Sequence, residues 1–361
     1  MKAALVYDRI NKWGGAERVL LALHEILPDA PLYTAVYSPQ KASWAKVFPE
    51  VIPTFLNKIP FAQDKHEFLG TLTPIAFETL NLDKYDLVIS VTSEAAKGVL
   101  TKPSTFHLCY CLTPTRYLWS GYKIYFANPW LKLVSKPVVS YLRYWDKIAA
   151  QRPDKILAIS TAVKKRIRKY YGRDSQVIFP PVELEKFSSP KDRKGEKDEF
   201  FLIVSRLTPY KKIDLAIRAF NELRLPLVIV GRGSEKRKLR SIAGRTIEFI
   251  DRLTDRQLAN YYRRCSGFVF PQEEDFGIAA VEAQAAGTPV IAYRAGGALD
   301  TVIDGRTGVF FNKQDKESLT RAVKRFRRID FDRQAIIKNA ARFSKERFKK
   351  EFRKLIENAR K

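Results

Sequence analysis

The sequence predicts an α/β protein that contains two Rossmann-like domains. Short apolar runs typical of buried strands alternate with helical patterns along most of the chain. The alternation stops in a polar stretch near residue 190 and then starts again. The length of 361 residues suits two domains of ~100–200 residues each. Apolar residues make up 45% of the chain, which is enough to form two cores and excludes general disorder.

The first domain is expected over residues 1–185. Its strand candidates are AALVY (3–7), DLVISV (86–91), FHLCYCL (106–112) and DKILAIS (154–160). The segment AERVLLALHEIL after the first strand has apolar side chains at helical spacing, and the basic helix TAVKKRIRKYY follows the fourth. Strands that alternate with helices form a parallel sheet with helices on both faces.

The second domain is expected over residues 198–335, after the linker SSPKDRKGEKDE (188–199). Its strand candidates are FFLIVSRL (200–207), PLVIVGRG (226–233), TIEFIDR, GFVFP (267–271) and TPVIAYR (288–294). A final helix over 345–361 is expected to pack back on the first domain. Two such domains predict a ligand in a cleft between them, at the carboxyl ends of the strands.

The net charge of +26 is unevenly distributed along the chain. Residues 101–150 hold seven basic and one acidic side chain, whereas residues 251–300 hold five basic and seven acidic ones. Such a surface attracts nucleic acid, anionic lipid headgroups or a phosphorylated small molecule, or it is simply solvated. The charge alone does not choose among these four.

Several classes are disfavoured by composition. Three cysteines argue against a disulfide-stapled scaffold, and three histidines leave little material for a histidine metal site. The alternating Cys109 and Cys111 are expected to be buried reduced thiols. Neither a signal peptide nor an apolar run of ~20 residues is visible, so we expect a cytoplasmic protein.

A glycine pair follows the first strand. In WGGAER (13–18), Gly14 and Gly15 stand just before a helix, where the backbone can approach a ligand and the helix N-terminus favours negative charge. The segment is not the GxGxxG fingerprint, and no acidic residue follows a second strand about 20 residues on. This argues against a nicotinamide enzyme.

A pair of cations follows the strand at 200–207. In SRLTPYKK (205–212), a turn at Pro209 could bring Arg206 and Lys211 together. A guanidinium fork and an ammonium group would then face a diphosphate. The alternative is two solvated loop cations.

The segment EEDFGIAAVEAQAAGTPVIA (273–292) is the strongest signal. Glu274 and Glu282 bracket seven residues, with Glu274 in a loop and Glu282 inside a helix. The run Phe276-Gly277-Ile278 leads into that helix, whose first N–H groups lack partners within it. The two carboxylates suit the two ends of one ligand rich in hydroxyls. The alternatives are a helix-terminal carboxylate with an ordinary surface Glu, or a glycosidase-like acid/base pair.

Together these motifs resemble the large family of retaining glycosyltransferases with the GT-B fold. The resemblance rests on the GGAE loop, the SRL…K pair, the E-x7-E element and AGGALDTVIDGRTGVFF (295–311), in the family's order over about residues 1–350. YDLVIS…AKGV, CLTPTRYLW and SRLTPYKKIDLAI look most like bacterial GDP-mannose-dependent mannosyltransferases of polysaccharide synthesis. The resemblance implies a nucleotide-sugar donor as substrate, no cofactor and no metal.

The resemblance implies catalytic roles for three residues. Glu274 would hold hydroxyls of the transferred hexose, and Arg206 and Lys211 would neutralise the diphosphate leaving group. Preorganised cations stabilise the charge that develops on such a group. Same-face attack by the acceptor would retain the configuration without a protein nucleophile.

Donor-binding roles follow from the same resemblance. Backbone amides at Phe276, Gly277 and Ile278 would support the sugar and the diphosphate, and Glu282 would bind the ribose hydroxyls. Gly14 and Gly15 would close over the donor from the N-terminal domain.

Four positions concern acceptor and donor choice. Leu112 and Ser93 stand where many relatives have histidine, and Asp251 stands where relatives tend to have glycine near the nucleotide base. Arg116 in TPTRYLW would meet the acceptor or a phosphate, or it is a structural arginine paired with a carboxylate.

Residues 117–147 mix tyrosines, tryptophans and lysines with a single acid, Asp146. Such a mixture suits a membrane interface, where rings lie at headgroup level and ammonium groups meet anionic phosphates. The alternative is a half-buried helix pair that covers the sheet.

The sequence therefore predicts a retaining, metal-independent hexosyltransferase. Its partners are a nucleotide sugar, a glycan or lipid-linked acceptor and the anionic inner face of the cell membrane, with no nucleic acid. A nucleotide-sugar epimerase or hydrolase on the same fold and a basic nucleic-acid-binding protein are the alternatives.

Overall fold

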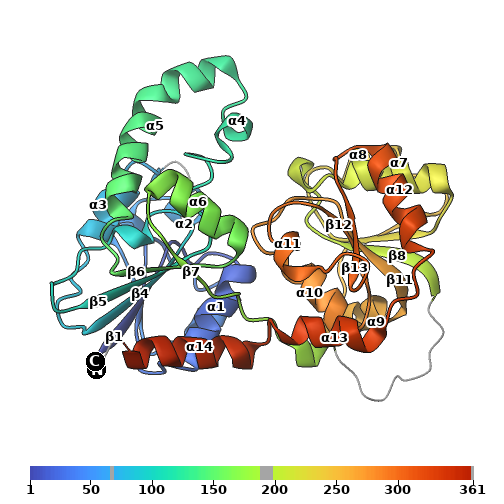
Figure 1. The fold of residues 1–361 in the computed structure, drawn as a ribbon. Helices are drawn as coiled ribbons and strands as arrows, with labels where there is room; N and C mark the ends of the chain where they lie inside the picture. The colour runs from blue at the N-terminus through green and yellow to red at the C-terminus, as the bar shows by residue number, and fades with distance from the viewer. Residues whose placement is uncertain (66–68, 188–197, 359–361) are drawn as a thin grey trace. The chain divides into compact units, whose positions relative to one another are not determined.

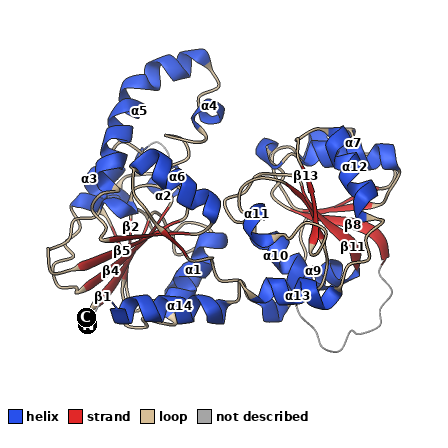
Figure 2. Ribbon diagram, viewed as in Figure 1, coloured by secondary structure: helices blue, strands red, loops and turns tan. Residues whose placement is uncertain are grey.

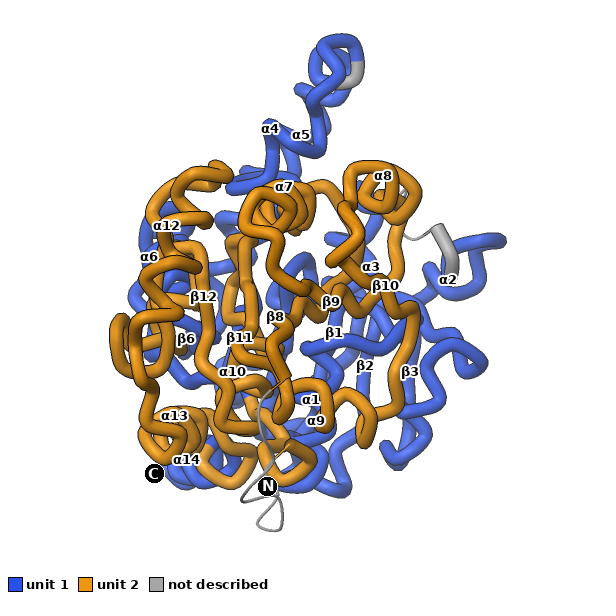
Figure 3. Tube along the Cα trace, turned by 90° about the vertical axis from the view of Figure 1, so that its right-hand side faces the viewer, with its two compact units in different colours: residues 1–180, 348–361 blue, residues 181–347 orange. Residues whose placement is uncertain are grey.

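The computed structural model describes residues 1–65, 69–187 and 198–358. The chain divides into two compact units, which Figure 3 shows in different colours. Unit 1 holds residues 1–180 and 348–361, and unit 2 holds residues 181–347. The linker expected over 188–199 lies outside the described residues except for its last two positions.

Unit 1 contains a parallel sheet with the strand order β3-β2-β1-β4-β5-β6-β7. Nearly all residues of the central strand β4 and of its neighbours β1 and β5 are buried. This is expected for strands that are covered on both faces. The described strands are β1 (Ala3–Tyr7), β2 (Leu32–Thr34), β3 (Val51–Pro53), β4 (Leu87–Thr92), β5 (Phe106–Cys111), β6 (Lys155–Ala158) and β7 (Gln176–Val177).

Helices lie on both faces of this sheet (Figures 1 and 2). One face has a core in which Val6, Phe77, Val88 and Trp145 are buried together. The described helices are α1 (Gly15–His24), α2 (Ala62–Lys65), α3 (Thr73–Glu78), α4 (Tyr122–Tyr125), α5 (Pro129–Ala149), α6 (Thr161–Tyr171) and α14 (Lys345–Asn358).

The end of the chain returns to unit 1 through α14. The Tyr110 ring of β5 lies 5.8 Å from that of Phe348 and 5.6 Å from that of Phe352, measured between centroids. All three side chains are fully buried. Residues 348–358 therefore complete a core that the first 180 residues begin.

Unit 2 contains a second parallel sheet, with the strand order β10-β9-β8-β11-β12-β13. Its described strands are β8 (Asp198–Val204), β9 (Leu227–Val230), β10 (Ile247–Ile250), β11 (Cys265–Phe270), β12 (Val290–Tyr293) and β13 (Gly308–Phe311). Its described helices are α7 (Ile213–Leu223), α8 (Lys236–Ser241), α9 (Asp255–Arg264), α10 (Ile278–Ala285), α11 (Ala298–Thr301), α12 (Lys316–Phe326) and α13 (Arg333–Ala341).

The two faces of this sheet bury different helices. Phe201 and Ile203 of β8 pack with Phe220 of α7 and Val323 of α12 on one face. On the other face, α10 packs against α9 and α13 (Figure 1). The alternation of side chains along a strand explains why β8 contributes its odd-numbered residues to the first face.

Local sequence signals explain several helix boundaries. The Ser160 hydroxyl accepts a hydrogen bond from the Val163 amide at the start of α6, and α6 ends at Gly172 in the left-handed conformation. Thr254 and Gln257 form a capping box at the start of α9. These caps set the first residues of α6 and α9 and the last residue of α6.

In each sheet, the order in which successive strands are added reverses beside the first strand of the unit. We call this point the sheet reversal. In unit 1, β1 lies between β2 and β4, and in unit 2, β8 lies between β9 and β11. The connections after β1 and β4 therefore run toward opposite edges of the first sheet, and those after β8 and β11 run toward opposite edges of the second. At such a reversal, the loops at the carboxyl ends of the two neighbouring strands diverge and leave room for a ligand.

Candidate functional site

In unit 2, the segments that follow β8 and β11 come together at the reversal of the sheet. The first segment contains the SRLTPYKK motif, and the second contains Glu274 and leads into α10. The two motifs are more than 60 residues apart in the chain. The parallel pairing of β8 with β11 therefore joins residues that the sequence kept apart.

Lys211 and Glu274 form an ion pair through Nζ and Oε1. Their side chains are 11% and 19% exposed, so both charges are partly screened from water but still reachable. Lys211 ends a short 3-10 turn over Pro209–Lys211, and Lys212 then takes a left-handed conformation with φ of 54°. This turn directs the Lys211 side chain to the Glu274 loop.

Arg206 has a different partner from Lys211. Its Nη2 donates a hydrogen bond of 2.8 Å to the Tyr210 hydroxyl. The Lys211 ammonium lies 5.1 Å from the centroid of the same Tyr210 ring. Tyr210 thus contacts both predicted cations, and sequence reasoning did not single it out.

The glycines of the AGG motif allow the Glu274 loop to pack closely. The Gly297 amide donates a hydrogen bond of 2.8 Å to the Glu274 carbonyl. A Cβ at Gly296 would lie 2.2 Å from that carbonyl oxygen, and φ at Gly296 is 60°. Only glycine fits there without a shift of backbone. The motif was noted in the sequence as a family likeness, but its contact with Glu274 came only from the structure.

The run Phe276-Gly277-Ile278 forms the start of α10. Gly277 has φ of 94°, and a Cβ there would lie 2.8 Å from the Phe270 ring. Phe276 is buried, with its ring 5.5 Å from that of Phe343. The Phe276 side chain therefore belongs to the core, and the segment can serve a ligand through its backbone. The N-terminus of α10 favours a negatively charged group.

Glu282 lies in the middle of α10 and is 5% exposed. Its Oε2 accepts a hydrogen bond of 3.1 Å from the Tyr262 hydroxyl of α9, and Tyr262 is fully buried. The two glutamates of the E-x7-E element thus have different environments. Glu274 is paired and partly exposed, whereas Glu282 is buried against a tyrosine.

Two side-chain oxygens in the same two segments are buried without a hydrogen-bond partner. They are Oγ1 of Thr208, after β8, and Oε1 of Gln272, after β11. A buried polar atom without a partner is costly, so such atoms mark places where a ligand or water completes the hydrogen bonding. Thr208 precedes Lys211 by three residues and Gln272 precedes Glu274 by two, so both oxygens belong to the segments that carry the pair. No sequence signal distinguished either residue.

In unit 1, the reversal of the sheet is occupied by Asp8, which directly follows β1. Its carboxylate accepts hydrogen bonds from the Thr92 hydroxyl and from the amides of Ser93, Glu94 and Ala96, at 2.6–3.0 Å. Asp8 therefore holds Ser93 through its amide and its hydroxyl. Leu112 extends β5, because its amide donates to the Thr92 carbonyl.

The glycine pair Gly14 and Gly15 lies in an exposed loop at the start of α1. Gly14 is the residue before the helix and has extended backbone with φ of −171°. A Cβ at Gly14 would lie 3.1 Å from Oε2 of Glu17, whose Oε1 accepts a hydrogen bond from Tyr7. The loop is thus small and open, as backbone contact with a ligand requires.

Beside Arg116, a buried ion pair joins Lys97 to Asp146 at 2.5 Å, with side chains 3% and 1% exposed. Asp146 also accepts hydrogen bonds from Thr115 at 3.0 Å and from the Trp119 indole at 2.6 Å. Burial alone would lower the pKa of Lys97, but Asp146 raises it above its ordinary value. Arg116 is half-buried, and its carbonyl accepts from the amide of Gly121.

The cysteines and other potential metal ligands form no cluster in the described ranges. Cys109, Cys111 and Cys265 are buried and lie in no disulfide, and burial raises the pKa of Cys109 to about 11. Residues 1–65, 69–187 and 198–358 contain no group of three or more His, Cys, Asp or Glu side chains placed to hold a metal ion. The same residues contain no helix that is long and apolar enough to span a membrane.

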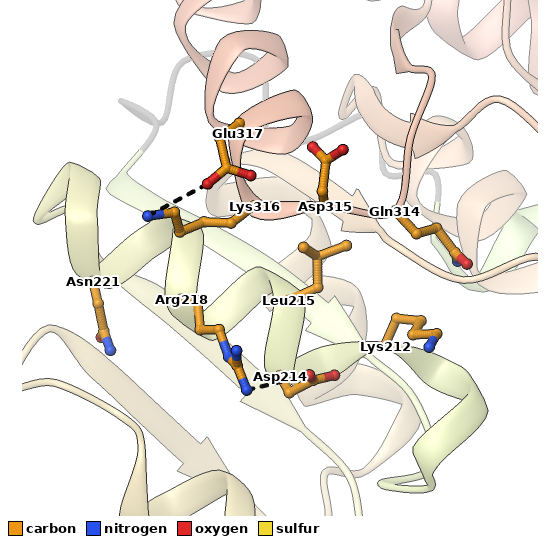
Figure 4. A pocket seen from close by; sticks show the side chains of 9 residues that line it. All are labelled: Lys212, Asp214, Leu215, Arg218, Asn221, Gln314, Asp315, Lys316 and Glu317. Carbon is orange, nitrogen blue, oxygen red and sulfur yellow. Dashed lines mark ion pairs between the residues drawn. The ribbon is translucent and has the colours of Figure 1, made fainter.

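A separate cavity of about 680 Å³ lies between α7 and α12 in unit 2 (Figure 4). Its lining combines Lys212, Asp214 and Arg218 with Lys316 and Glu317. It includes neither Lys211 nor Glu274. The cavity is therefore distinct from the pair at the sheet reversal.

Comparison with known sequences finds a family match in unit 2, the unit that contains Lys211 and Glu274. A family model described as "Glycosyl transferases group 1" matches residues 185–343, which lie in unit 2. An uncharacterized glycosyltransferase of Methanocaldococcus jannaschii is 29% identical over 208 residues, which is 56% of this chain and 58% of that protein. The expected resemblance to group 1 glycosyl transferases is thus confirmed for residues 185–343.

A second relative carries a more specific name. The "GDP-mannose-dependent alpha-(1-6)-phosphatidylinositol monomannoside mannosyltransferase" of Mycolicibacterium smegmatis is 28% identical over 198 residues, which is 47% of this chain and 52% of that protein. The chain spans only between half and three fifths of the length of these two relatives.

The fold is shared with a solved structure over almost the whole chain. Anabaena HepE in complex with UDP superposes with a TM-score of 0.72 at 19% identity, covering 99% of this chain and 100% of that chain. The predicted fold class is confirmed, since both proteins consist of two parallel-sheet, Rossmann-like domains of the GT-B type.

Proposed function

We propose that this protein transfers a hexose from a nucleotide-diphosphate sugar to a glycan or lipid-linked acceptor, with retention of configuration. The observation that carries the proposal is the Lys211–Glu274 pair at the sheet reversal of unit 2. It combines a cation for phosphate and a carboxylate for hydroxyl groups at the place where parallel sheets bind ligands. The match of residues 185–343 to group 1 glycosyl transferases supports it.

In this mechanism, the cations act on the leaving group. The bond between the anomeric carbon and the phosphate oxygen breaks, and negative charge grows on the departing nucleotide diphosphate. Lys211 is nearly buried, so its charge acts on the phosphate oxygens with little screening. Arg206 adds a planar fork of donors, and its exposed position lets it turn from Tyr210 to the ligand.

Glu274 has the complementary role toward the sugar. Its carboxylate accepts hydrogen bonds from hexose hydroxyls, and the start of α10 at Phe276, Gly277 and Ile278 presents backbone N–H groups to the diphosphate. The acceptor hydroxyl attacks the anomeric carbon on the face that the leaving group vacates. Its proton passes to the departing phosphate oxygen, so no protein nucleophile is required.

Glu282 is proposed to hold the ribose hydroxyls. Its carboxylate accepts a hydrogen bond from Tyr262, which fixes the orientation of the side chain. For unit 1, the proposal assigns backbone contacts with the donor to Gly14 and Gly15 and a contact with the acceptor to Arg116.

Mannose is the favoured sugar and GDP-mannose the favoured donor. The name of the M. smegmatis relative supports this choice. Asp251, at the carboxyl end of β10, forms an ion pair with Lys236, so the position near the proposed base is charged where relatives tend to have glycine. Thermal-shift measurements with GDP, UDP and ADP and their sugars would rank the donors, and stabilisation by UDP-sugars alone would reject GDP-mannose.

The proposal is tested by turnover of the donor in matched variants. Lys211→Ala and Glu274→Gln should each lower donor hydrolysis or transfer by about 10²–10³-fold, the usual loss for a preorganised electrostatic contact. Glu273→Gln and Lys212→Asn change the neighbouring charges and should keep turnover within about twofold. Equal losses in all four variants, or none, would reject the site. Release of free sugar or an epimer with every acceptor supplied would identify a hydrolase or epimerase instead.

A further inference from the structure

Helix α5 carries apolar side chains that point away from the core of unit 1. The seven largest are between 41% and 76% exposed. We call them the α5 stripe: Trp130, Leu133, Val134, Val138, Tyr141, Tyr144 and Ile148. A side chain such as tryptophan or leucine is normally left singly on a surface, whereas here seven share one helix.

The α5 stripe follows the period of the helix. Trp130, Val134, Tyr141, Tyr144 and Ile148 are separated by four, seven, three and four residues, which places them on one face. The buried residues Val139, Leu142, Asp146 and Ala149 form another face. A surface helix ordinarily has one apolar face for the core. The second apolar face of α5 therefore serves something other than the fold.

In the first half of α5, none of the side chains that the structure describes is buried. Among residues 129–138, each side chain that the structure describes is exposed or half-buried. Figure 1 shows this half of α5 and the neighbouring α4 extending away from the sheet of unit 1. Ile124 and Tyr125 of α4 are 71% and 58% exposed and extend the apolar surface. A small cluster of Leu118, Val139 and Leu142 holds the base of this projection.

Positive charge borders the α5 stripe. Lys132, Lys136 and Lys147 of α5 and Lys123 of α4 are exposed. The only acidic residue in 117–147 is Asp146, which is buried and paired with Lys97. The exposed face of the projection is thus apolar and cationic without a compensating anion of its own.

We propose that the α5 stripe docks on an anionic lipid bilayer. Tryptophan and tyrosine side chains settle at the headgroup level, apolar side chains enter the acyl boundary, and the lysines meet anionic phosphates. A second copy of this chain fits less well, because symmetrical pairing would bring the lysines of two stripes together. The proposal stands apart from the proposed function, because it uses no residue of the Lys211–Glu274 site.

The test is flotation of the full chain with vesicles. Vesicles of phosphatidylcholine with roughly 30 mol% phosphatidylglycerol should carry the protein, and vesicles of phosphatidylcholine alone should carry much less. Raising the salt should weaken the binding, because screening reduces the attraction of the lysines. Equal binding to both vesicles, or no binding to either, would overturn the proposal.

Two variants separate the apolar and ionic parts. The triple change W130S/L133S/V134S should lower the vesicle partition coefficient by roughly a hundredfold, since interfacial binding scales with buried apolar area. Lys132→Gln with Lys136→Gln should lower it by about 30-fold, as expected for the loss of two surface cations. The matched controls are Phe61→Ser, at a side chain 79% exposed in unit 1, and K350Q/K354Q on α14; both should bind like the wild type.

Two further measurements keep the test decisive. Circular dichroism and the unfolding transition test whether the triple variant is folded. We expect a native spectrum and a cooperative transition, because the three replaced side chains are exposed. Sedimentation velocity without lipid distinguishes self-association. A dimer that W130S/L133S/V134S disrupts, with no vesicle binding, would replace the bilayer by a second copy. If both control variants also lost vesicle binding, the binding would depend on the net charge and the apolar surface of the whole protein, and the α5 stripe would be rejected as the docking site.

Discussion

The two units place charged groups at the same point of the same topology and use them differently. In unit 1, Asp8 at the sheet reversal accepts four short hydrogen bonds from its own chain, and the nearby Lys97–Asp146 pair is almost fully buried. In unit 2, Lys211 and Glu274 pair with each other and are partly exposed.

This difference indicates when a charged side chain at a sheet reversal stabilises the fold and when it can bind a ligand. The position alone makes a carboxylate or an ammonium a candidate ligand contact. A group whose hydrogen bonds are all satisfied inside the protein stabilises the fold, and removing it leaves buried partners without compensation. A partly exposed ion pair can exchange a partner for a ligand at a smaller cost. Substitutions should therefore affect stability in unit 1 and turnover in unit 2.

The largest effect is expected for Lys97→Met. The change leaves the Asp146 carboxylate buried without its cation, so the free energy of unfolding should fall by about 3–5 kcal/mol. Urea denaturation followed by circular dichroism measures the loss. The double change K97M/D146L removes both charges and should regain much of it. A single variant as stable as the wild type would mean that the pair is not buried in solution.

A pH effect of intermediate size is expected from His107 in unit 1. The imidazole is buried with Nε2 2.9 Å from the Ser90 hydroxyl, and burial lowers the pKa of His107 to about 3. The folded protein therefore binds this proton only below about pH 3, whereas the unfolded chain binds it below pH ~6.5. Stability is fully present above pH ~6.5 and falls as the pH drops toward 3, by up to roughly 4 kcal/mol.

The measurement is urea denaturation at several pH values between 3 and 7 with the wild type and His107→Leu. The variant cannot bind the proton, so its stability should depend less on pH in this window. All three histidines lie in unit 1 by sequence, so unit 2 offers no matching histidine effect. Identical slopes for the two proteins would exclude His107 as the cause.

The smallest effect on stability is expected for Lys211→Met. This pair is more exposed than Lys97–Asp146, so the free energy of unfolding should fall less, by about 1–3 kcal/mol, as expected when a partly buried polar group loses its partner. Donor turnover of the same variant should nevertheless fall as steeply as proposed for Lys211→Ala. The comparison between the units fails if Lys211→Met loses as much stability as Lys97→Met.

Most of the fold was predictable because it depends on local patterns. The strands expected at 3–7, 86–91 and 106–112 correspond to β1, β4 and β5, since a strand buried on both faces is a continuous apolar run. The Gly-rich loops and the E-x7-E spacing were visible for the same reason. Residue type and short spacing are enough to recognise them.

Contacts between distant segments were not predictable in this way. The turn at Pro209 predicts that Arg206 and Lys211 face one diphosphate, but no local pattern indicates that Lys211 pairs with Glu274 within the protein. The buried oxygens of Thr208 and Gln272 carry no sequence signal, because a partnerless atom is defined by what surrounds it. The aromatic-basic segment is likewise divided only by tertiary packing, since half of α5 covers the sheet and half projects from it.

The sequence by itself determined the two-sheet architecture, the family likeness and the residue types of the proposed donor site. Those features follow from periodicity, glycine positions and motif order, which are properties of short segments. The tertiary structure decided which charged groups are enclosed and which stay partly exposed, because burial and ion-pair partners come from residues far apart in the chain. Asp8 and Glu274 are both carboxylates after a strand, and only their surroundings assign one to the fold and the other to the proposed ligand.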